Sequence, residues 1–251
     1  MKMINVTAAS LPASRILQLA AGLGLFSLAL LAGLPAKAAN FTPPDGCTLN
    51  LTVQNHSCTV TQYFTCSADP KGDQRSATFA QDGLRYLSRI DAETRWLESS
   101  SPPSGINDVL VEDARDHASF STLASTGFDD FDFWTQSNSG EKLRHVGNNK
   151  LTGRKVTIDD VELEETRFQL KTYNEAGDLL IDRKGQQYIS REMGRFFGGK
   201  ETMNDWTGAK SESDDSPVLF RFPGDTGFGS TTPQFDCGMQ MVGLPQNGHA
   251  V

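Results

Sequence analysis

Short extended segments with alternating apolar and polar residues recur along most of the chain, and they limit the folds that it can adopt. A few turn residues separate them, as in Gln81-Asp82-Gly83 and Gly147-Asn148-Asn149. Segments joined this closely form antiparallel hairpins, because parallel strands need a long crossover. The sequence therefore predicts a mainly β protein built as an antiparallel meander. The expected segments are 75–80, 84–91, 94–98, 119–125, 130–136, 142–146, 150–158, 161–173 and 179–190.

About ten strands in sequence reach the limit of a twisted open sheet, so this sheet should curl into a barrel or half-barrel. At most one short helix is expected. Residues 108–117 are the only plausible helical segment, and they are polar enough to form a loop instead. Residues 204–217, rich in Asp, Ser and Lys, are expected to form an exposed linker.

The segment 155–163 gives the clearest hairpin, because its apolar residues share one face across the turn Asp159-Asp160. Phe168 and Leu170 fall out of step with that face. Keeping them on it requires one extra residue, a β-bulge, near Glu164-Glu165. The apolar residues of the hairpin are Val156, Ile158, Val161 and Leu163.

The first 38 residues are typical of a secretory signal peptide. Lys2 and Arg15 precede an apolar run over 16–34, and small residues end the segment at Ala38. The alternative is an uncleaved anchor, since about 19 residues at about 1.5 Å each nearly span a bilayer core. We expect cleavage after Ala38. The product, residues 39–251, would be a single β-rich domain, periplasmic or secreted, without a stable membrane anchor.

The four cysteines, Cys47, Cys58, Cys66 and Cys237, all follow the predicted cleavage point. An even number in an exported chain indicates two disulfides, and the lack of a C-x₂-C pair argues against zinc. Cys58 and Cys66 end one strand, about 26 Å apart, and cannot pair. Two pairings stay open: Cys47–Cys66 with Cys58–Cys237, or Cys47–Cys58 with Cys66–Cys237. Both tether the C-terminal segment to the first hairpin.

The charge balance excludes two classes of partner. The signal peptide holds three of the 23 basic residues and no acidic one, so the remaining chain has 20 Lys and Arg against 31 Asp and Glu. A net charge of −11 without a dense basic cluster disfavours nucleic acid and anionic lipid surfaces.

Motifs for nucleotide binding and nucleophilic catalysis are incomplete. Residues 194–201 look briefly like a phosphate-binding loop, but Glu201 stands where a hydroxyl would hold magnesium. No G-x-S-x-G elbow surrounds any serine. We therefore expect no cofactor and no metal, and the sequence favours a protein that is not an enzyme without excluding activity.

The most unusual stretch is 128–134, with the sequence FDDFDFW. On a strand it places Asp130, Asp132 and Trp134 on one face, and Phe131 and Phe133 on the other. Carboxylates beside aromatic rings suit sugar stacking and glycoside hydrolysis, although a turn followed by a core strand explains them equally. Asp130, Asp132 and Trp134 are the candidate ligand-binding residues.

Three functions fit these features. The preferred one is an exported protein that binds an apolar ligand, such as a lipid or acyl chain, in its concave sheet. By architecture alone it is similar to lipocalin-like barrels and curved-sheet lipoprotein carriers, with no shared motif. The second is a non-catalytic interaction or structural module of the cell envelope, in which exposed tryptophans such as Trp96, Trp134 and Trp206 contact a protein partner. The third is a carboxylate-based hydrolase using Asp130 and Asp132.

Overall fold

Residues 39–238 are the part of the chain that the computed structural model describes, and they contain fourteen strands and one helix. All strands belong to one antiparallel sheet, with β11 paired to β10 off its main path. From β1 to β10 each strand pairs with its sequence neighbour, so the predicted mainly β meander is confirmed. The elements are β1 (Cys47–Asn55), β2 (Thr59–Cys66), β3 (Gln74–Ala80), β4 (Gly83–Ile90), β5 (Trp96–Ser101), β6 (Ile106–Asp116), α1 (Phe120–Thr126), β7 (Phe128–Ser137), β8 (Lys142–Ile158), β9 (Val161–Tyr173), β10 (Leu179–Ser190), β11 (Arg195–Phe197), β12 (Lys200–Asp205), β13 (Lys210–Asp214) and β14 (Pro217–Arg221).

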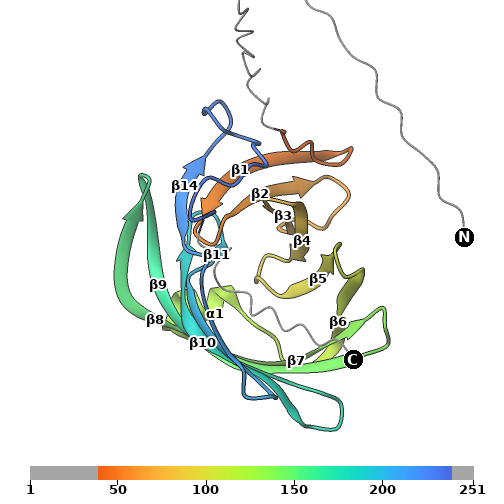
Figure 1. The fold of residues 1–251 in the computed structure, drawn as a ribbon. Coiled ribbons are helices and arrows are strands. Elements are labelled where there is room, and N and C mark those ends of the chain that lie inside the picture. The colour runs from red at the N-terminus through yellow and green to blue at the C-terminus, as the bar shows by residue number, and fades with distance from the viewer. Residues whose placement is uncertain (1–38, 239–251) are drawn as a thin grey trace, which may run out of the picture. The chain divides into compact units, whose positions relative to one another are not determined.

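The sheet is strongly curled (Figure 1). Its two edge strands, β13 and β14, follow each other in the sequence. Only Asp215 and Ser216 separate them, and in residues 39–238 no ladder joins them. The turn between β1 and β2 packs on this seam. The backbone N–H of His56 donates to the Ser216 carbonyl at 3.0 Å, and Ser57 Oγ donates to the Asp214 carbonyl at 2.5 Å. The result is a curled sheet that is not closed, as the sequence predicts.

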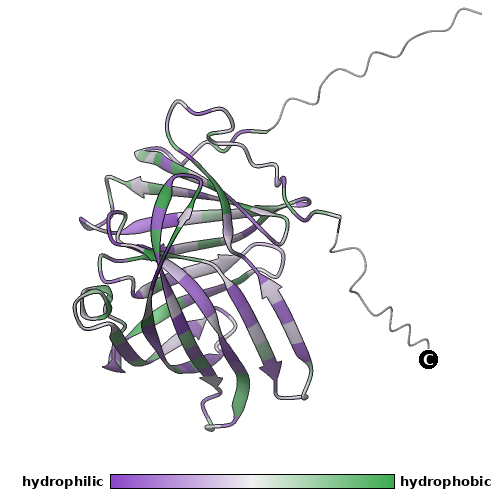
Figure 2. Cartoon of the chain, turned by 90° about the vertical axis from the view of Figure 1, so that its left-hand side faces the viewer, coloured by the Kyte–Doolittle hydropathy of each residue, from purple (hydrophilic) through white to green (hydrophobic). Residues whose placement is uncertain are grey.

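The hairpin predicted over 155–163 joins β8 to β9 and contributes to the main core. Asp159 and Asp160 have φ values of 47° and 65°, which a type I′ turn requires. Leu163 is buried, and Val156, Ile158 and Val161 pack against the cluster that contains it. Polar and apolar residues alternate along the strands (Figure 2). The other buried members of this cluster are Leu51, Val53, Tyr188, Phe197 and Phe220.

The irregularity predicted near Glu164-Glu165 occurs at that level of the sheet, but the extra residues lie in the partner strand. The register of β8 against β9 shifts between Leu151 and Lys155. The pairing of β9 with β10 has no shift between Glu164 and Thr172, so β9 itself carries no extra residue. Leu163 and Phe168, five positions apart, therefore lie on opposite faces of β9, and the shared face predicted for them is wrong, although both are buried.

The predictions for two neighbouring segments, one expected as a helix and one as a strand, are both wrong. Residues 108–117, expected as the only plausible helix, mostly belong to strand β6, because the segment pairs with β5 on one side and β7 on the other. Residues 119–125, expected as a strand, form the helix α1. The Ser119 side chain caps it by accepting from the Thr122 N–H at 3.2 Å, and Gly127 ends it at φ 83°.

The prediction of a linker over 204–217 is also wrong, because most of this segment belongs to the hairpin β12–β13. Asp205 stabilises the turn by accepting from the N–H groups of Thr207 at 2.8 Å and Ala209 at 3.0 Å. The strand β13 is exposed and polar. Main-chain bonds alone are enough for such an edge strand, so the sequence shows no apolar alternation there.

The disulfides are Cys47–Cys66 and Cys58–Cys237, the first of the two predicted pairings. The second disulfide holds the C-terminal segment against β1 and β2. Buried glutamines fasten that segment: Gln62 donates to the Ser230 carbonyl at 2.7 Å, and Gln54 donates to the Thr232 carbonyl at 3.0 Å.

The predicted signal peptide, residues 1–38, lies outside the described residues, so neither its cleavage nor the alternative of an uncleaved anchor is tested. Among residues 39–238 no helix has the length and apolar character needed to cross a membrane.

Candidate functional site

The curled sheet lines a cavity that we call the interior cavity. Its volume is about 460 Å³, and its wall takes residues from every strand between β2 and β11. Strands at the two ends of this series can line one space only because the sheet bends round it. Seven of the lining side chains are Phe, Tyr or Trp: Tyr63, Tyr86, Trp96, Phe131, Phe133, Phe196 and Phe197.

Aromatic rings form one continuous side of the interior cavity. The ring of Phe133 lies 5.8 Å from that of Phe131 and 5.1 Å from His145, and His145 lies 5.4 Å from Trp96. The indole N–H of Trp96 is buried and has no hydrogen-bond partner among the described residues. This side is therefore a row of rings tilted 33–50° against one another, and its Trp96 indole donor is unsatisfied among the described residues.

His145 is the polar centre of the aromatic side. Its Nε2 contacts Thr135 Oγ1 at 2.9 Å, and its Nδ1 contacts Thr172 Oγ1 at 3.2 Å. Burial, and secondarily the charge of Arg183, lowers its pKa to about 4. The imidazole is therefore neutral at pH 7, and the aromatic side carries no net charge there.

Two arginines line the interior cavity. Arg95 forms an ion pair with Asp91 at 2.5 Å. Arg195, on β11, is buried and forms no ion pair with the described residues; its side chain lies over the Tyr63 ring, 3.6 Å from the centroid. Burial lowers the Arg195 pKa to about 10, so its guanidinium is still protonated at pH 7. Arg195 is the charged group of the wall that lacks a counter-ion.

The sequence-predicted residues Asp130, Asp132 and Trp134 lie on the opposite face of β7 from Phe131 and Phe133, and none of the three lines the interior cavity. Their role in ligand binding stays a prediction.

Two of those residues have partners on β8. Asp132 accepts from Arg144 Nε at 2.7 Å and Nη2 at 2.5 Å, and the bond to Arg144 lowers the Asp132 pKa. A carboxylate held in this way is a poor general acid, so the hydrolase hypothesis gains no support from it. Lys142 lies 5.2 Å from the Trp134 ring centroid.

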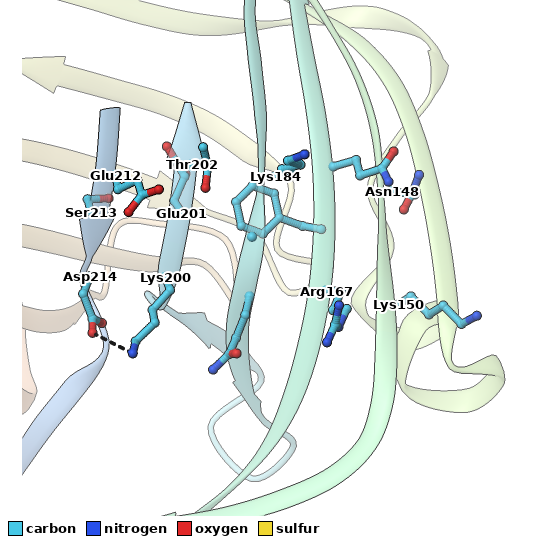
Figure 3. Close-up of a pocket in the computed structure, with 14 residues that line it drawn as sticks. Asn148, Lys150, Arg167, Lys184, Lys200, Glu201, Thr202, Glu212, Ser213 and Asp214 are labelled. Carbon is cyan, nitrogen blue, oxygen red and sulfur yellow. Dashed lines mark ion pairs between the residues drawn. The ribbon is translucent and has the colours of Figure 1, made fainter. Parts of the chain in front are cut away.

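A second pocket, the outer groove, has a volume of about 840 Å³ and lies across β8, β9, β10, β12 and β13 (Figure 3). Exposed charged side chains line it, and Lys200 pairs with Asp214 at 3.7 Å. Its other charged residues are Lys150, Arg167, Lys184, Glu201 and Glu212. The outer groove is larger than the interior cavity, but half of its lining residues are charged and Phe168 is the one aromatic residue among them.

Residues 39–238 contain no group of three or more His, Cys, Asp or Glu side chains that could hold a metal ion. Comparisons of the chain with protein-family models, curated protein sequences and solved structures give no significant match. The interior cavity is therefore the candidate site on its geometry alone.

Proposed function

We propose that this protein is a non-catalytic binding protein that holds a small apolar or amphipathic molecule inside its curled sheet. The observation that carries the proposal is the aromatic interior cavity, to which every strand from β2 to β11 contributes. Small-molecule sites are typically concave, mostly apolar and about 300–1,000 Å³ in volume, with a few fixed polar groups. The interior cavity has these properties, and its fixed polar groups include His145, Arg95 and Arg195.

The location of this activity is the second part of the proposal. Two disulfides indicate an oxidising, extracytoplasmic compartment. The predicted signal peptide extends this to the periplasm or the external medium.

Calorimetry with decanol tests the proposal, because this probe has an apolar chain and no charge. We expect the purified protein to bind decanol, and Leu170→Trp, which fills part of the interior cavity, to weaken binding about tenfold or more. Leu179→Trp is the matched control, since Leu179 is an exposed leucine of β10. No binding by the unaltered protein, or equal losses in both variants, would exclude the interior cavity as the site.

A second candidate function is contact with an envelope protein. Of the three tryptophans predicted to be exposed, Trp206, at the turn between β12 and β13, is 75% exposed, whereas Trp96 and Trp134 are half-buried. Tryptophan is enriched at protein interfaces. One exposed ring is a smaller apolar surface than the interior cavity offers, so we rank this function second.

A further inference from the structure

Arg195 lies on the wall shared by the interior cavity and a second pocket. That second pocket, the entrance pocket, has a volume of about 650 Å³ and is bordered by β2, β3 and the loop between them. Tyr63 and Arg195 are the two residues that line both spaces. A molecule with its chain in the interior cavity and its head toward the entrance pocket would place that head beside Arg195.

The charge of Arg195 is incompletely satisfied within the described residues. Its Nη1 donates to Gln74 Oε1 at 3.0 Å, and its Nε is buried without a hydrogen-bond partner. Only 7% of the residue is exposed to solvent. Burial raises the pKa of the Tyr63 phenol, so this ring is neutral at pH 7 and supplies no counter-charge.

Two other arginines near the entrance pocket, unlike Arg195, have carboxylate partners. Arg75 donates to Asp69 at 2.6 Å, and Arg89 donates to Asp73 at 3.1 Å. Each of these guanidiniums is also more exposed to solvent than Arg195. A buried charge without a partner lowers stability unless another group compensates it. The Tyr63 ring and the Gln74 amide compensate the charge of Arg195 only in part, which points to an anionic group that comes from outside the chain.

We propose that Arg195 binds the carboxylate of an anionic amphiphile whose apolar chain occupies the interior cavity. This inference rests on the proposed function and adds the class of ligand to it. A guanidinium fork matches a carboxylate with two parallel hydrogen bonds.

Calorimetry with decanoate and decanol, which share one chain length, tests this assignment. The unaltered protein should bind decanoate about tenfold or more tightly than decanol, and Arg195→Gln should remove most of that preference, a loss of about 10- to 100-fold for decanoate. Decanol affinity should change by less than about threefold. Arg95→Gln is the matched control, because Arg95 lines the same cavity and has its own carboxylate partner.

A second variant keeps the test decisive if Arg195→Gln does not fold. Gln74→Glu places a carboxylate at the atom that already accepts from Arg195, and it should lower decanoate affinity while decanol still binds. Equal affinity of the unaltered protein for both probes, or an unchanged preference in both variants, overturns the role of Arg195 and leaves the binding function intact. Failure of both probes to bind overturns the proposed function and this inference with it.

Discussion

The disulfide between Cys58 and Cys237 connects two positions that are 179 residues apart in the sequence. Cys58 is fully buried immediately before β2, so the bond fixes the C-terminal segment to the first hairpin of the sheet. The other disulfide, Cys47–Cys66, spans only 19 residues and joins the two ends of that hairpin.

Removing the long-range disulfide should lower stability more than removing the local one. The chain-entropy relation gives a loss of about 5 kcal/mol for the Cys58→Ser/Cys237→Ser protein and about 3 kcal/mol for the Cys47→Ser/Cys66→Ser protein. Urea unfolding monitored by circular dichroism measures both. The reverse order of stabilities would contradict the view that the long-range disulfide holds the C-terminal segment against the first hairpin.

His145 should make the protein less stable in mild acid. Its pKa is about 4 when folded and 6.5 as a free side chain, so the unfolded chain takes up the proton first as the pH falls. The contribution is absent above pH 6.5 and grows to about 3 kcal/mol of destabilisation near pH 4. Unfolding of the unaltered protein and of His145→Asn at pH 7 and pH 4.5 measures it, and a stability difference that does not change with pH would contradict it.

Asp129 should act in the opposite direction. Burial raises its pKa to about 6, from 3.8 as a free side chain, so the folded protein binds the proton more tightly than the unfolded chain does. Its stabilising effect is complete below about pH 3.8 and is lost as the pH rises through 6. Asp129→Asn should therefore gain stability relative to the unaltered protein between pH 4.5 and pH 7. A constant difference over that range would show that the Asp129 pKa is ordinary.

Gly185 should tolerate no side chain, because an added Cβ would lie 2.1 Å from the Lys200 carbonyl oxygen and 3.0 Å from the Phe168 ring. Gly185→Ala would push β12 away from β10 and should lower the free energy of unfolding by about 1–3 kcal/mol. Gly238→Ala is the control, since nothing lies within 4 Å of a Cβ at that position. Equal stability of the two variants in urea would contradict this packing.

Replacing a tryptophan that lines the interior cavity should affect binding more than replacing one that does not. Trp96→Leu removes a ring from the interior cavity and should weaken decanol binding about tenfold, whereas Trp134→Leu should leave it within about threefold. Calorimetry of both variants compares them directly. A larger loss in Trp134→Leu would favour the sequence-predicted site at Asp130, Asp132 and Trp134 over the interior cavity.

The features that the sequence predicts correctly arise from local patterns. The hairpin at Asp159-Asp160 has alternating apolar residues on both sides of a turn that two aspartates can form, so pattern and geometry agree. A hairpin that places Cys47 opposite Cys66 gave one of the two predicted disulfide pairings, and the observed register places these residues opposite each other. Residues 108–117 gave no clear pattern, because β6 is largely exposed and carries mixed polarity.

The candidate site was harder to predict, because its residues come from many strands. Arg195 lies in a segment that looks like a turn, and neither its burial nor its missing counter-ion is visible without the curl of the sheet. Phe131 and Phe133 could have been found, since strand alternation already placed them opposite Asp130 and Asp132. Similarly, the Ser119 and Gly127 caps could have located α1.

Native mass spectrometry of the protein, purified under mild conditions from the compartment to which its host exports it, tests the central claim most directly. We expect a fraction with the added mass of a small molecule, and we expect Leu170→Trp to lose that mass while Leu179→Trp retains it. A bare polypeptide mass in the unaltered protein, together with no binding of decanol or decanoate, would contradict the account of a ligand inside the curled sheet.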